Sequence, residues 1–573
     1  MSERRAAWAW AVVSTLAGVA AVGCANAEQD DGAGSRAATA TVPVKIEESD
    51  LYKLVGSTLY VQNASTGLNV IDVSDPALPV FKNRVRELAG NAGELYVRQT
   101  TAFVLLKEVV PACELPPELD SWAITSASQV VAVTDADSAS AAEIAGELCL
   151  PGAIVTSRLV GEVLYVVTSL TGPGGAATWV FSVDTADPGA MAVVDHLGFD
   201  GEGYEVHVTD QALYVAQGRD GGARTRVRTV DIAPGDGTLR ERGSFEVPGS
   251  VLSRFHLDEQ AGTVRLVTFV SRSSGSNLYV VDMEDPDQPE LAGSLTHLAP
   301  GEDLHATRFD GDVAYVVTYE PVVVQIDPLW VVSLANPTAP RIVAELEVPG
   351  WSDFVFPRGD RLVAVGRGDR GERIASSLFD VSDLAHPRQL ARVEFGGSDA
   401  TSEAGVDFRG VSIVDAELGE PALLAVPLSN NVWRGSRCEA RHGVQLLDLG
   451  ATQLELRGWI PQEGRVRRTV PVGGRLLTVT DQEVATVDVA SRGAPDVTSS
   501  LTVGDPEAAD PCVAPPAPPE GLVSEQAGGL FFCRASPVGA GRGAGAALGA
   551  LLLGLAAALR RRSGRGRRAD PSL

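Results

Sequence analysis

Val281-Asp282-Met283-Glu284-Asp285-Pro286 is the clearest copy of a short sequence that recurs along this chain of 573 residues. Residues 71–76 and 183–188 repeat the same spacing of one Asp and a following Asp-Pro pair. An Asp side chain accepts hydrogen bonds from backbone N–H groups two residues further on, and Pro fixes φ and ends strand pairing. We therefore interpret these Asp residues as structural parts of turns and not as catalytic groups.

Turn sequences of this kind, which we call marks, recur at a period near 50 residues, and this period predicts about nine repeats. They centre on Asp72, Asp135, Asp184, Asp231, Asp282, Ser333, Asp380, Asp448 and Asp488. Such a period, filled by strands alone, is typical of four-stranded propeller blades. The predicted fold is all-β, a single large β-propeller of eight or nine four-stranded blades. The number of blades stays open between eight and nine. The second unit, whose turn sequence matches the pattern weakly, or the terminal unit either forms a blade of its own or only closes the ring.

The fifth unit predicts the strand order within a blade. Its strands a, b, c and d are expected at 251–257, 264–270, 278–283 and 290–295. The apolar runs of strands b and c suit strands that are buried on both faces between neighbouring blades. Packing of blade against blade is therefore expected to form the core.

The balance of charges argues against nucleic acid as a partner. The chain has 47 Lys and Arg against 74 Asp and Glu, a formal net charge of −27, and both of its ends are basic. The part between the ends is therefore more acidic still and should repel phosphates. Nucleophile elbows, HExxH, P-loops and EF-hand loops are absent from the sequence, so no catalytic residue and no cofactor is predicted, and whether the protein is an enzyme stays open.

The N-terminus has the arrangement of a secretory signal, with Arg4 and Arg5 before an apolar run. Residues 1–24 are interpreted as a lipoprotein-like signal peptide, because residues 21–24 resemble a lipoprotein signal box in which Cys24 is lipidated. Ala21 stands where Leu is usual, and residues 25–27 offer a rival cleavage site of the small-x-small type. Residues 25–45 would form a polar tether.

The C-terminus also has the composition of a targeting signal. Residues 46–504 are assigned to the propeller and 505–540 to a Pro/Gly-rich linker, and 541–573 combine an apolar segment with an Arg-rich tail. This end resembles the C-terminal sorting signals of myxobacterial surface proteins, and the resemblance implies processing at Cys533. The alternative is a plain tail anchor. Either reading, like the N-terminus, places the protein in the cell envelope outside the cytoplasm, at the outer membrane or cell surface.

Four cysteines remain after Cys24 and Cys533, an even number that suits disulfides in an oxidising compartment. We expect Cys113 to pair with Cys149 and Cys438 with Cys512, although four cysteines allow three connectivities. The absence of CxxC and of a nearby His pair argues against zinc.

Residues 299–357 carry a more specific pattern, including Arg308-Phe309-Asp310-Gly311-Asp312, Asn336-Pro337 and Val348-Pro349-Gly350-Trp351. This stretch resembles the secreted bacterial and archaeal β-propeller domain family, which is distantly WD40-like, and the match extends more weakly over about residues 46–504. The repeats around Asp72 are also similar to the LVIVD repeats of prokaryotic surface proteins. The family often has His where this chain has Phe356. The resemblance implies a fold and a location, but no activity.

Two insertions, 107–128 and 428–442, are expected to be b–c connections on the same face of the disc. Long loops on a rigid scaffold commonly bind partners, so this sector is the predicted partner-binding surface, with Trp122, Trp433, Arg434 and Arg437 as its candidate residues. The alternative is that disulfides only hold two loose insertions in place.

Two functions follow from these observations. The first is a non-enzymatic binding scaffold at the cell surface, attached to the membrane by an N-terminal lipid, a C-terminal segment or both, with an unknown protein, glycan or matrix partner. The second is an envelope hydrolase or lyase with a metal or acid–base site in the central channel. Its candidate metal ligands are His207, His256 and His305, which are expected at comparable places in strand a of three successive units.

Overall fold

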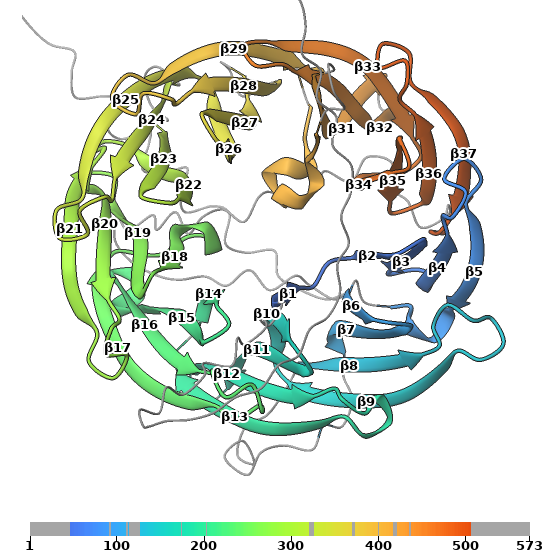
Figure 1. Cartoon of the computed structure of the whole chain (residues 1–573), viewed down its shortest axis with the longest axis horizontal. Coiled ribbons are helices and arrows are strands. Elements are labelled where there is room, and N and C mark those ends of the chain that lie inside the picture. Colours follow the sequence, from blue (N-terminus) through green and yellow to red (C-terminus); the bar gives the residue numbers. More distant parts are fainter. Residues whose placement is uncertain are drawn as a thin grey trace, which may run out of the picture. The chain divides into compact units, whose positions relative to one another are not determined.

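The computed structural model describes residues 46–505, except 91–92, 110–112, 114–125, 173–174, 202, 320–325, 369–372, 399, 416–420 and 435–436. The described residues form nine antiparallel sheets arranged as a ring around a central channel (Figure 1). They contain short 3-10 helices but no α-helix. Within these ranges no helix is long and apolar enough to cross a membrane.

Blades 1 and 2 have four strands each, and blade 3 has five, because β1 (Ile46–Glu48) is added at its inner edge. Blade 1 contains β2 (Tyr52–Val55), β3 (Thr58–Asn63), β4 (Gly67–Asp72) and β5 (Val80–Val85), followed by the 3-10 helix η1 (Arg86–Leu88). Blade 2 contains β6 (Glu94–Arg98), β7 (Thr101–Val109), β8 (Ala127–Thr134) and β9 (Glu143–Pro151). Blade 3 contains β10 (Ala153–Val160), β11 (Val163–Gly172), β12 (Gly175–Asp184) and β13 (Ala192–Asp200), with η3 (Pro188–Ala190) before β13.

The next three blades repeat the four-stranded pattern. Blade 4 contains β14 (Gly203–Val208), β15 (Ala212–Arg219), β16 (Arg224–Asp231) and β17 (Arg240–Pro248), with η4 (Asp220–Gly222) between β15 and β16. Blade 5 begins after η5 (Arg254–His256) and contains β18 (Leu257–Gln260), β19 (Thr263–Ser271), β20 (Gly275–Asp282) and β21 (Glu290–Leu298). Blade 6 contains β22 (Asp303–Asp310), β23 (Val313–Tyr319), β24 (Ile326–Ser333) and β25 (Arg341–Pro349).

The last three blades complete the ring. Blade 7 contains β26 (Trp351–Arg358), β27 (Arg361–Arg367), β28 (Ile374–Asp380) and β29 (Arg388–Phe395). Blade 8 follows η6 (Glu403–Gly405) and η7 (Phe408–Gly410) and contains β30 (Ser412–Val414), β31 (Ala422–Arg434), β32 (Arg437–Leu449) and β33 (Leu454–Gln462). Blade 9 contains β34 (Val466–Val472), β35 (Arg475–Thr480), β36 (Glu483–Asp488) and β37 (Asp496–Thr502).

The turn after each third strand explains the recurring Asp. The Asp282 carboxylate accepts a hydrogen bond of 2.8 Å from the Glu284 N–H, and Asp285 accepts one of 3.0 Å from Asp287. Each of the nine marks lies at or just after the end of a third strand, and the mark at Asp135, after β8, belongs to a complete blade. The all-β propeller prediction is confirmed, and the blade count is nine.

The core lies between blades. Within the described residues, nine apolar clusters occupy the nine interfaces between neighbouring blades, and each draws its side chains mainly from second and third strands. Val215 of β15 and Val230 of β16, both fully buried, illustrate this at the interface of blades 3 and 4. Strands buried on both faces need continuous apolar runs, as the sequence has.

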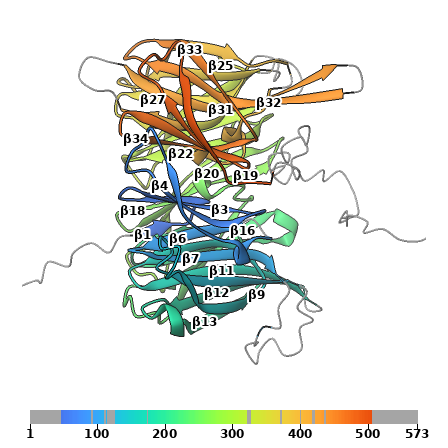
Figure 2. The same cartoon turned by 90° about the vertical axis from the view of Figure 1, so that its right-hand side faces the viewer.

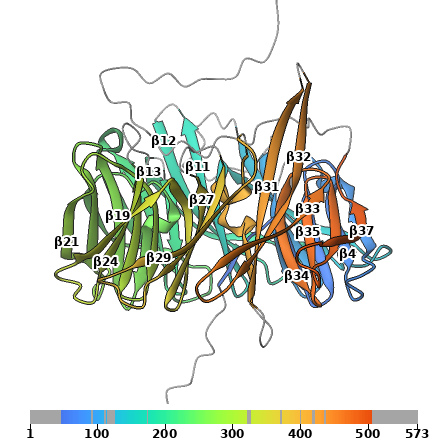
Figure 3. The same cartoon turned by 90° about the horizontal axis from the view of Figure 1, so that it is seen from above.

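Two expected boundaries are wrong. The fifth unit's strand a was expected at 251–257, but residues Arg254–His256 form η5, because the Ser253 side chain accepts a hydrogen bond from Phe255 N–H and turns the chain. The insertion at 428–442 is not a loose loop, because β31 and β32 pair residue for residue from Ala422↔Leu449 to Arg434↔Arg437. This long hairpin extends beyond the disc (Figures 2 and 3).

The ring has two distinct faces. The a–b face carries the a–b and c–d turns, and the b–c face carries the b–c turns and the links between blades. β1 begins at the a–b face, because Ile46 pairs with Val160 at the end of β10. The β31–β32 hairpin lies on the opposite, b–c face, as does the end of the described chain, where Val503 N–H bonds to the carbonyl of Gln482 in a b–c turn.

Candidate functional site in the central channel

Two segments outside the regular blades enter the central channel (Figure 1). One is β1 with the residues that join it to β2, and the other is the link 396–411 between blades 7 and 8, which contains η6 and η7. Nine inner strands enclose a wide ring, and side chains alone fill only narrow rings. The extra segments therefore supply backbone and charged side chains to the space that the inner strands leave.

The N-terminal segment runs along blade 3 and then crosses to blade 1. β1 is antiparallel to β10, with Glu48 opposite Arg158. The Ser49 hydroxyl donates to Glu94 on β6 at 2.6 Å, and Leu95 N–H donates to the Asp50 carbonyl at 2.8 Å. The chain thus contacts the inner strands of blades 3 and 2 within five residues.

Four side chains, Asp50, Asp407, Arg409 and Arg468, fasten the two segments together, and we call this group the channel lock. Arg409 of η7 donates to the Ser49 carbonyl at 2.6 Å, and Arg468 of β34 donates to Asp50 at 2.8 Å and also pairs with Asp407. Burial opposes ionisation of Asp407, but the hydrogen bond from Arg409 and the charge of Arg468 outweigh it and hold the Asp407 pKa at about 2. The charges of the channel lock therefore neutralise one another.

Blades 3 to 5 form the other charged part of the channel. Glu48 accepts from Arg158 at 3.0 Å and from Arg254 at 2.7 Å. Glu205, on β14, accepts a hydrogen bond from the Arg254 backbone, yet burial raises its pKa to about 7. A carboxyl group with such a pKa can exchange protons near neutral pH.

A cluster of aromatic and basic side chains lies next to these groups, and we call it the arginine–phenylalanine cluster. Its members are Arg254, Phe255, Arg308, Phe354 and Phe408. The Phe255 ring meets the Phe354 and Phe408 rings edge to face, with centroids 5.1 and 5.0 Å away. The Arg254 and Arg308 guanidinium carbons lie 5.2 and 5.3 Å from the Phe255 centroid. All five side chains are half-buried, so solvent reaches them.

The three candidate histidines lie at the expected blades but in different surroundings. His207 is on β14, and burial lowers its pKa, although the Asp258 charge partly offsets this. His305, on β22, bonds through Nε2 to Asp353 at 3.0 Å. Contrary to expectation, His256 is in η5 and not in strand a; it is 1% exposed, and neither of its ring nitrogens has a hydrogen-bond partner in the described ranges.

The described residues contain no group of three or more His, Cys, Asp or Glu side chains that could hold a metal ion. His207, His256 and His305 therefore do not converge as a ligand set in this part of the chain.

Part of the predicted partner-binding sector is described. Cys113 and Cys149 form a disulfide with their Cα atoms 5.4 Å apart, which ties the b–c connection of blade 2 to β9. In the long hairpin, Trp433 is opposite Cys438 and Arg434 opposite Arg437, but the structure describes only the backbone of these four. Cys24, Trp122, Cys512 and Cys533 lie outside the described residues, as do the signal, tether, linker and tail segments.

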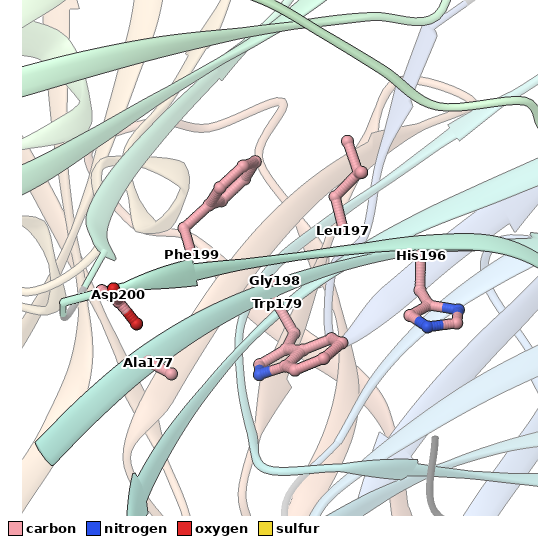
Figure 4. A pocket seen from close by; sticks show the side chains of 7 residues that line it. All are labelled: Ala177, Trp179, His196, Leu197, Gly198, Phe199 and Asp200. Carbon is pink, nitrogen blue, oxygen red and sulfur yellow. The ribbon is translucent and has the colours of Figure 1, made fainter. Parts of the chain in front are cut away.

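A shallow groove of about 380 Å³ also lies on the outer half of blade 3 (Figure 4), lined by Ala177, Trp179, His196, Leu197, Gly198, Phe199 and Asp200. The Trp179 indole stacks on the His196 ring with centroids 5.7 Å apart. Gly198 leaves room for it, because a Cβ there would lie 2.7 Å from the indole. Residues of two strands, β12 and β13, line this groove, whereas several blades contribute side chains to the channel. We therefore take the channel as the candidate site.

The channel segments leave only a weak signal in the sequence. The interval between Asp380 and Asp448 is longer than the usual period, which indicates extra residues. The sequence pattern alone attributes all of them to the insertion at 428–442. In the structure the extra residues are shared between that hairpin and the link 396–411. No local motif distinguishes the link, because its partners, Ser49 and Arg468, are far from it in the sequence.

These features define a nine-bladed β-propeller whose channel is occupied by its own chain. The chain belongs to the family described as Beta propeller domain, whose sequence profile matches residues 38–177 and 170–491. Uncharacterized proteins of two archaea are similar to it: one of Archaeoglobus fulgidus is 38% identical over 154 residues, or 27% of this chain, and one of Methanocaldococcus jannaschii is 36% identical over 153 residues, or 26%. Each match spans 23% of the relative's length.

Solved structures with some similarity are other propellers at low identity. Sqt1 from Chaetomium thermophilum has a TM-score of 0.37 and 15% identity, over 59% of this chain and 81% of its own. A putative 6-phosphogluconolactonase from Bacteroides fragilis has a TM-score of 0.34 and 12% identity, over 60% of this chain and 95% of its own. At these TM-scores the two structures say nothing further about this chain.

Proposed function

We propose that this protein is an exported β-propeller, held at the cell envelope, that binds a protein, glycan or matrix partner without catalysing a reaction. The observation that carries the proposal is the long hairpin of β31 and β32, which extends from the b–c face (Figure 3). A hairpin of two paired strands, each of thirteen residues, presents residues rigidly away from a scaffold. In the channel, in contrast, two segments of the chain itself contact the inner strands (Figure 1).

The proposed attachment fits this arrangement. We keep lipidation at Cys24 and processing at Cys533 as parts of the proposal, with residues 25–45 as the tether. Because β1 begins at the a–b face, a lipid at Cys24 would hold that face toward the membrane. The b–c face, with the hairpin and the connection that carries Cys113, would then be turned outward.

The test is binding to envelope fractions of the native host, measured by co-sedimentation of the purified protein. In one variant, residues 431–440 are replaced by Asn-Gly, which closes the hairpin at the Asn430↔Arg441 pair with a turn suited to two-residue loops. We expect this variant to lose about tenfold or more in affinity, because the removed tip includes the candidate contact residues Trp433, Arg434 and Arg437.

The matched control shortens another b–c hairpin. Replacement of residues 171–176 by Asn-Gly closes β11 and β12 at the Leu170↔Ala177 pair. This variant should sediment with envelopes as the wild type does. Equal binding by all three proteins would contradict the assignment of the long hairpin, and no binding by the wild type would contradict the scaffold function.

Acid–base chemistry in the channel, as in a hydrolase or lyase, is a second candidate, and Glu205 is the observation that favours it. Its pKa of about 7 suits a group that gives and takes a proton at neutral pH. For the metal-dependent form, the measurement is metal content of the purified protein. Stoichiometric metal that is lost in His207→Ala, His256→Ala or His305→Ala variants would favour the enzyme over the scaffold.

A further inference from the structure

Arg308 differs from the other arginines of the channel. Arg158, Arg254, Arg409 and Arg468 each contact a carboxylate. Arg308, on the inner strand β22, has neither a hydrogen bond nor an ion pair among the described residues, and its guanidinium lies over the Phe255 ring, 5.3 Å from the ring centroid. A half-buried guanidinium has lost part of its hydration, so its five N–H donors are available for an anion.

Three carboxylates attract Arg308, namely Asp258, Asp310 and Glu48, and two of them are already engaged. Glu48 is shared by Arg158 and Arg254, and Asp258 pairs with Arg265, which is 5% exposed. Burial and the positive charge of Arg254 lower the pKa of Arg308, against the attraction of Asp258, Asp310 and Glu48. Glu205, with its raised pKa, supplies only part of a negative charge at neutral pH. Asp310 attracts Arg308 but forms no ion pair with it among the described residues, so the Arg308 guanidinium keeps N–H donors for an anion.

The walls beside Arg308 are apolar. Phe255, Phe354 and Phe408 meet with ring centroids 5.0 to 5.4 Å apart, and all three keep some exposure to solvent. They come from η5, β26 and η7, so three separate parts of the chain build this wall. An inorganic anion gains nothing from aromatic walls, whereas an organic acid places its carboxylate on the guanidinium and its body against the rings.

We infer that the arginine–phenylalanine cluster binds the carboxylate of a small organic acid, with the Arg308 guanidinium as the main contact and Phe255 as the apolar wall. The fork of the guanidinium matches the two oxygens of a carboxylate. This site is separate from the long hairpin, so it stands whether or not the hairpin binds an envelope partner.

The inference is tested by calorimetric titration of the purified protein at fixed ionic strength with three probes. Benzoate represents an acid with an aromatic body, glucuronate an acid with a sugar body, and sulfate an anion without an organic body. We expect one equivalent of at least one carboxylate to bind, and sulfate to bind at least about tenfold more weakly. Benzoate alone would identify aromatic acids as the ligand class, and glucuronate alone would identify sugar acids.

The decisive variant is Arg308→Met, which keeps the length of the side chain and removes the charge. It should bind the carboxylate at least about tenfold more weakly, because the charged hydrogen bonds are lost. Arg84→Met is the matched control, since Arg84 lies 4.5 Å from the Phe81 ring on the outer strand β5, away from the channel. If Arg308→Met does not fold, Arg308→Gln and Arg308→Lys are titrated in its place, and only the Lys variant should bind.

Three results would overturn the inference. They are the absence of carboxylate binding to the wild type, equal affinity for sulfate and carboxylates, and unchanged affinity after loss of the Arg308 charge. A loss of binding in Arg84→Met as large as in Arg308→Met would place the site elsewhere.

Discussion

Single residues of the channel take their roles from their partners and not from their type. Arg468 is 1% exposed and is neutralised by Asp50 and Asp407, so it is structural, because removing one member of a buried pair leaves the other charge unpaired. Arg308 has no such partner within the described ranges of the chain. Their different surroundings, and not the sequence around them, separate a structural arginine from a candidate ligand contact.

His256 provides a prediction for pH dependence. Burial, together with the positive potential of His305, lowers its pKa from 6.5 to about 3. The unfolded chain therefore binds the proton more readily than the folded chain. The contribution of neutral His256 to stability is complete well above pH 6.5 and is lost as the pH falls from there toward 3, with a cost of about 2 kcal/mol between pH 7 and pH 5.

The measurement is urea unfolding at pH 7 and pH 5. His256→Phe should lose less stability than the wild type over this interval, because it has no buried group to protonate. His386→Phe is the control, since the His386 side chain is 83% exposed; it should keep the wild-type dependence. Equal pH dependence in all three proteins would mean that His256 does not titrate between the folded and unfolded states as described.

At the scale of elements, the strand β1 is the addition that most alters the repeat. It covers the inner edge of β10, whereas the inner edges of the other blades have no fifth strand within the described residues. An inner edge without a partner leaves backbone groups to water, and pairing protects them. β1 thus joins the N-terminal end of the propeller to blade 3 and not to its own blade.

Hydrogen exchange provides the prediction for this element. Amides of β10 should exchange more slowly than those of β14, the inner strand of the next blade. In a chain that begins at residue 50, the β10 amides should lose this protection, because their partner strand is absent, while β14 should change little. If β10 and β14 exchange alike in the full chain, the pairing of β1 with β10 is not stable in solution.

At the scale of the whole molecule, the ring closes without a shared strand. All four strands of blade 1 follow one another in the chain, and so do those of blade 9. Closure depends on an apolar cluster that includes Leu59, Ile71 and Leu477, with a hydrogen bond of 3.0 Å from Asn63 to the Asp481 carbonyl. Among the described residues no segment of chain links blade 9 to blade 1, and we expect the ring to open first at this interface.

The prediction compares two buried leucines. Leu477→Ala at the closing interface and Leu362→Ala at the interface of blades 6 and 7 should each cost about 2–5 kcal/mol, since both side chains are at most 1% exposed. In native-state hydrogen exchange, Leu477→Ala should expose blades 1 and 9 together before the rest of the ring. Leu362→Ala should not open its two neighbouring blades selectively. Identical hydrogen-exchange patterns in the two variants would argue against the interface of blades 1 and 9 as the weak point of the ring.

The sequence alone determined the repeated unit. The Asp282-type turns and the paired apolar strands are local, because an Asp side chain bonds to N–H groups two residues away and a doubly buried strand needs a continuous apolar run. The spacing of about 50 residues between these turns then predicted one four-stranded blade for each repeat. The spacing left the number of blades open between eight and nine, because the turn sequence at Asp135 matches the repeated pattern only weakly.

Only the tertiary structure decided how the channel is built. Asp50 and Arg468 are 418 residues apart, and Arg308 meets Phe255 of η5, whose ring in turn meets Phe408 of η7. Closing the ring creates these neighbours, and no local pattern encodes them, since each side chain alone resembles an ordinary surface charge or core aromatic. The turns and strands therefore follow from short-range physics, whereas the candidate site exists only once nine blades have met around it.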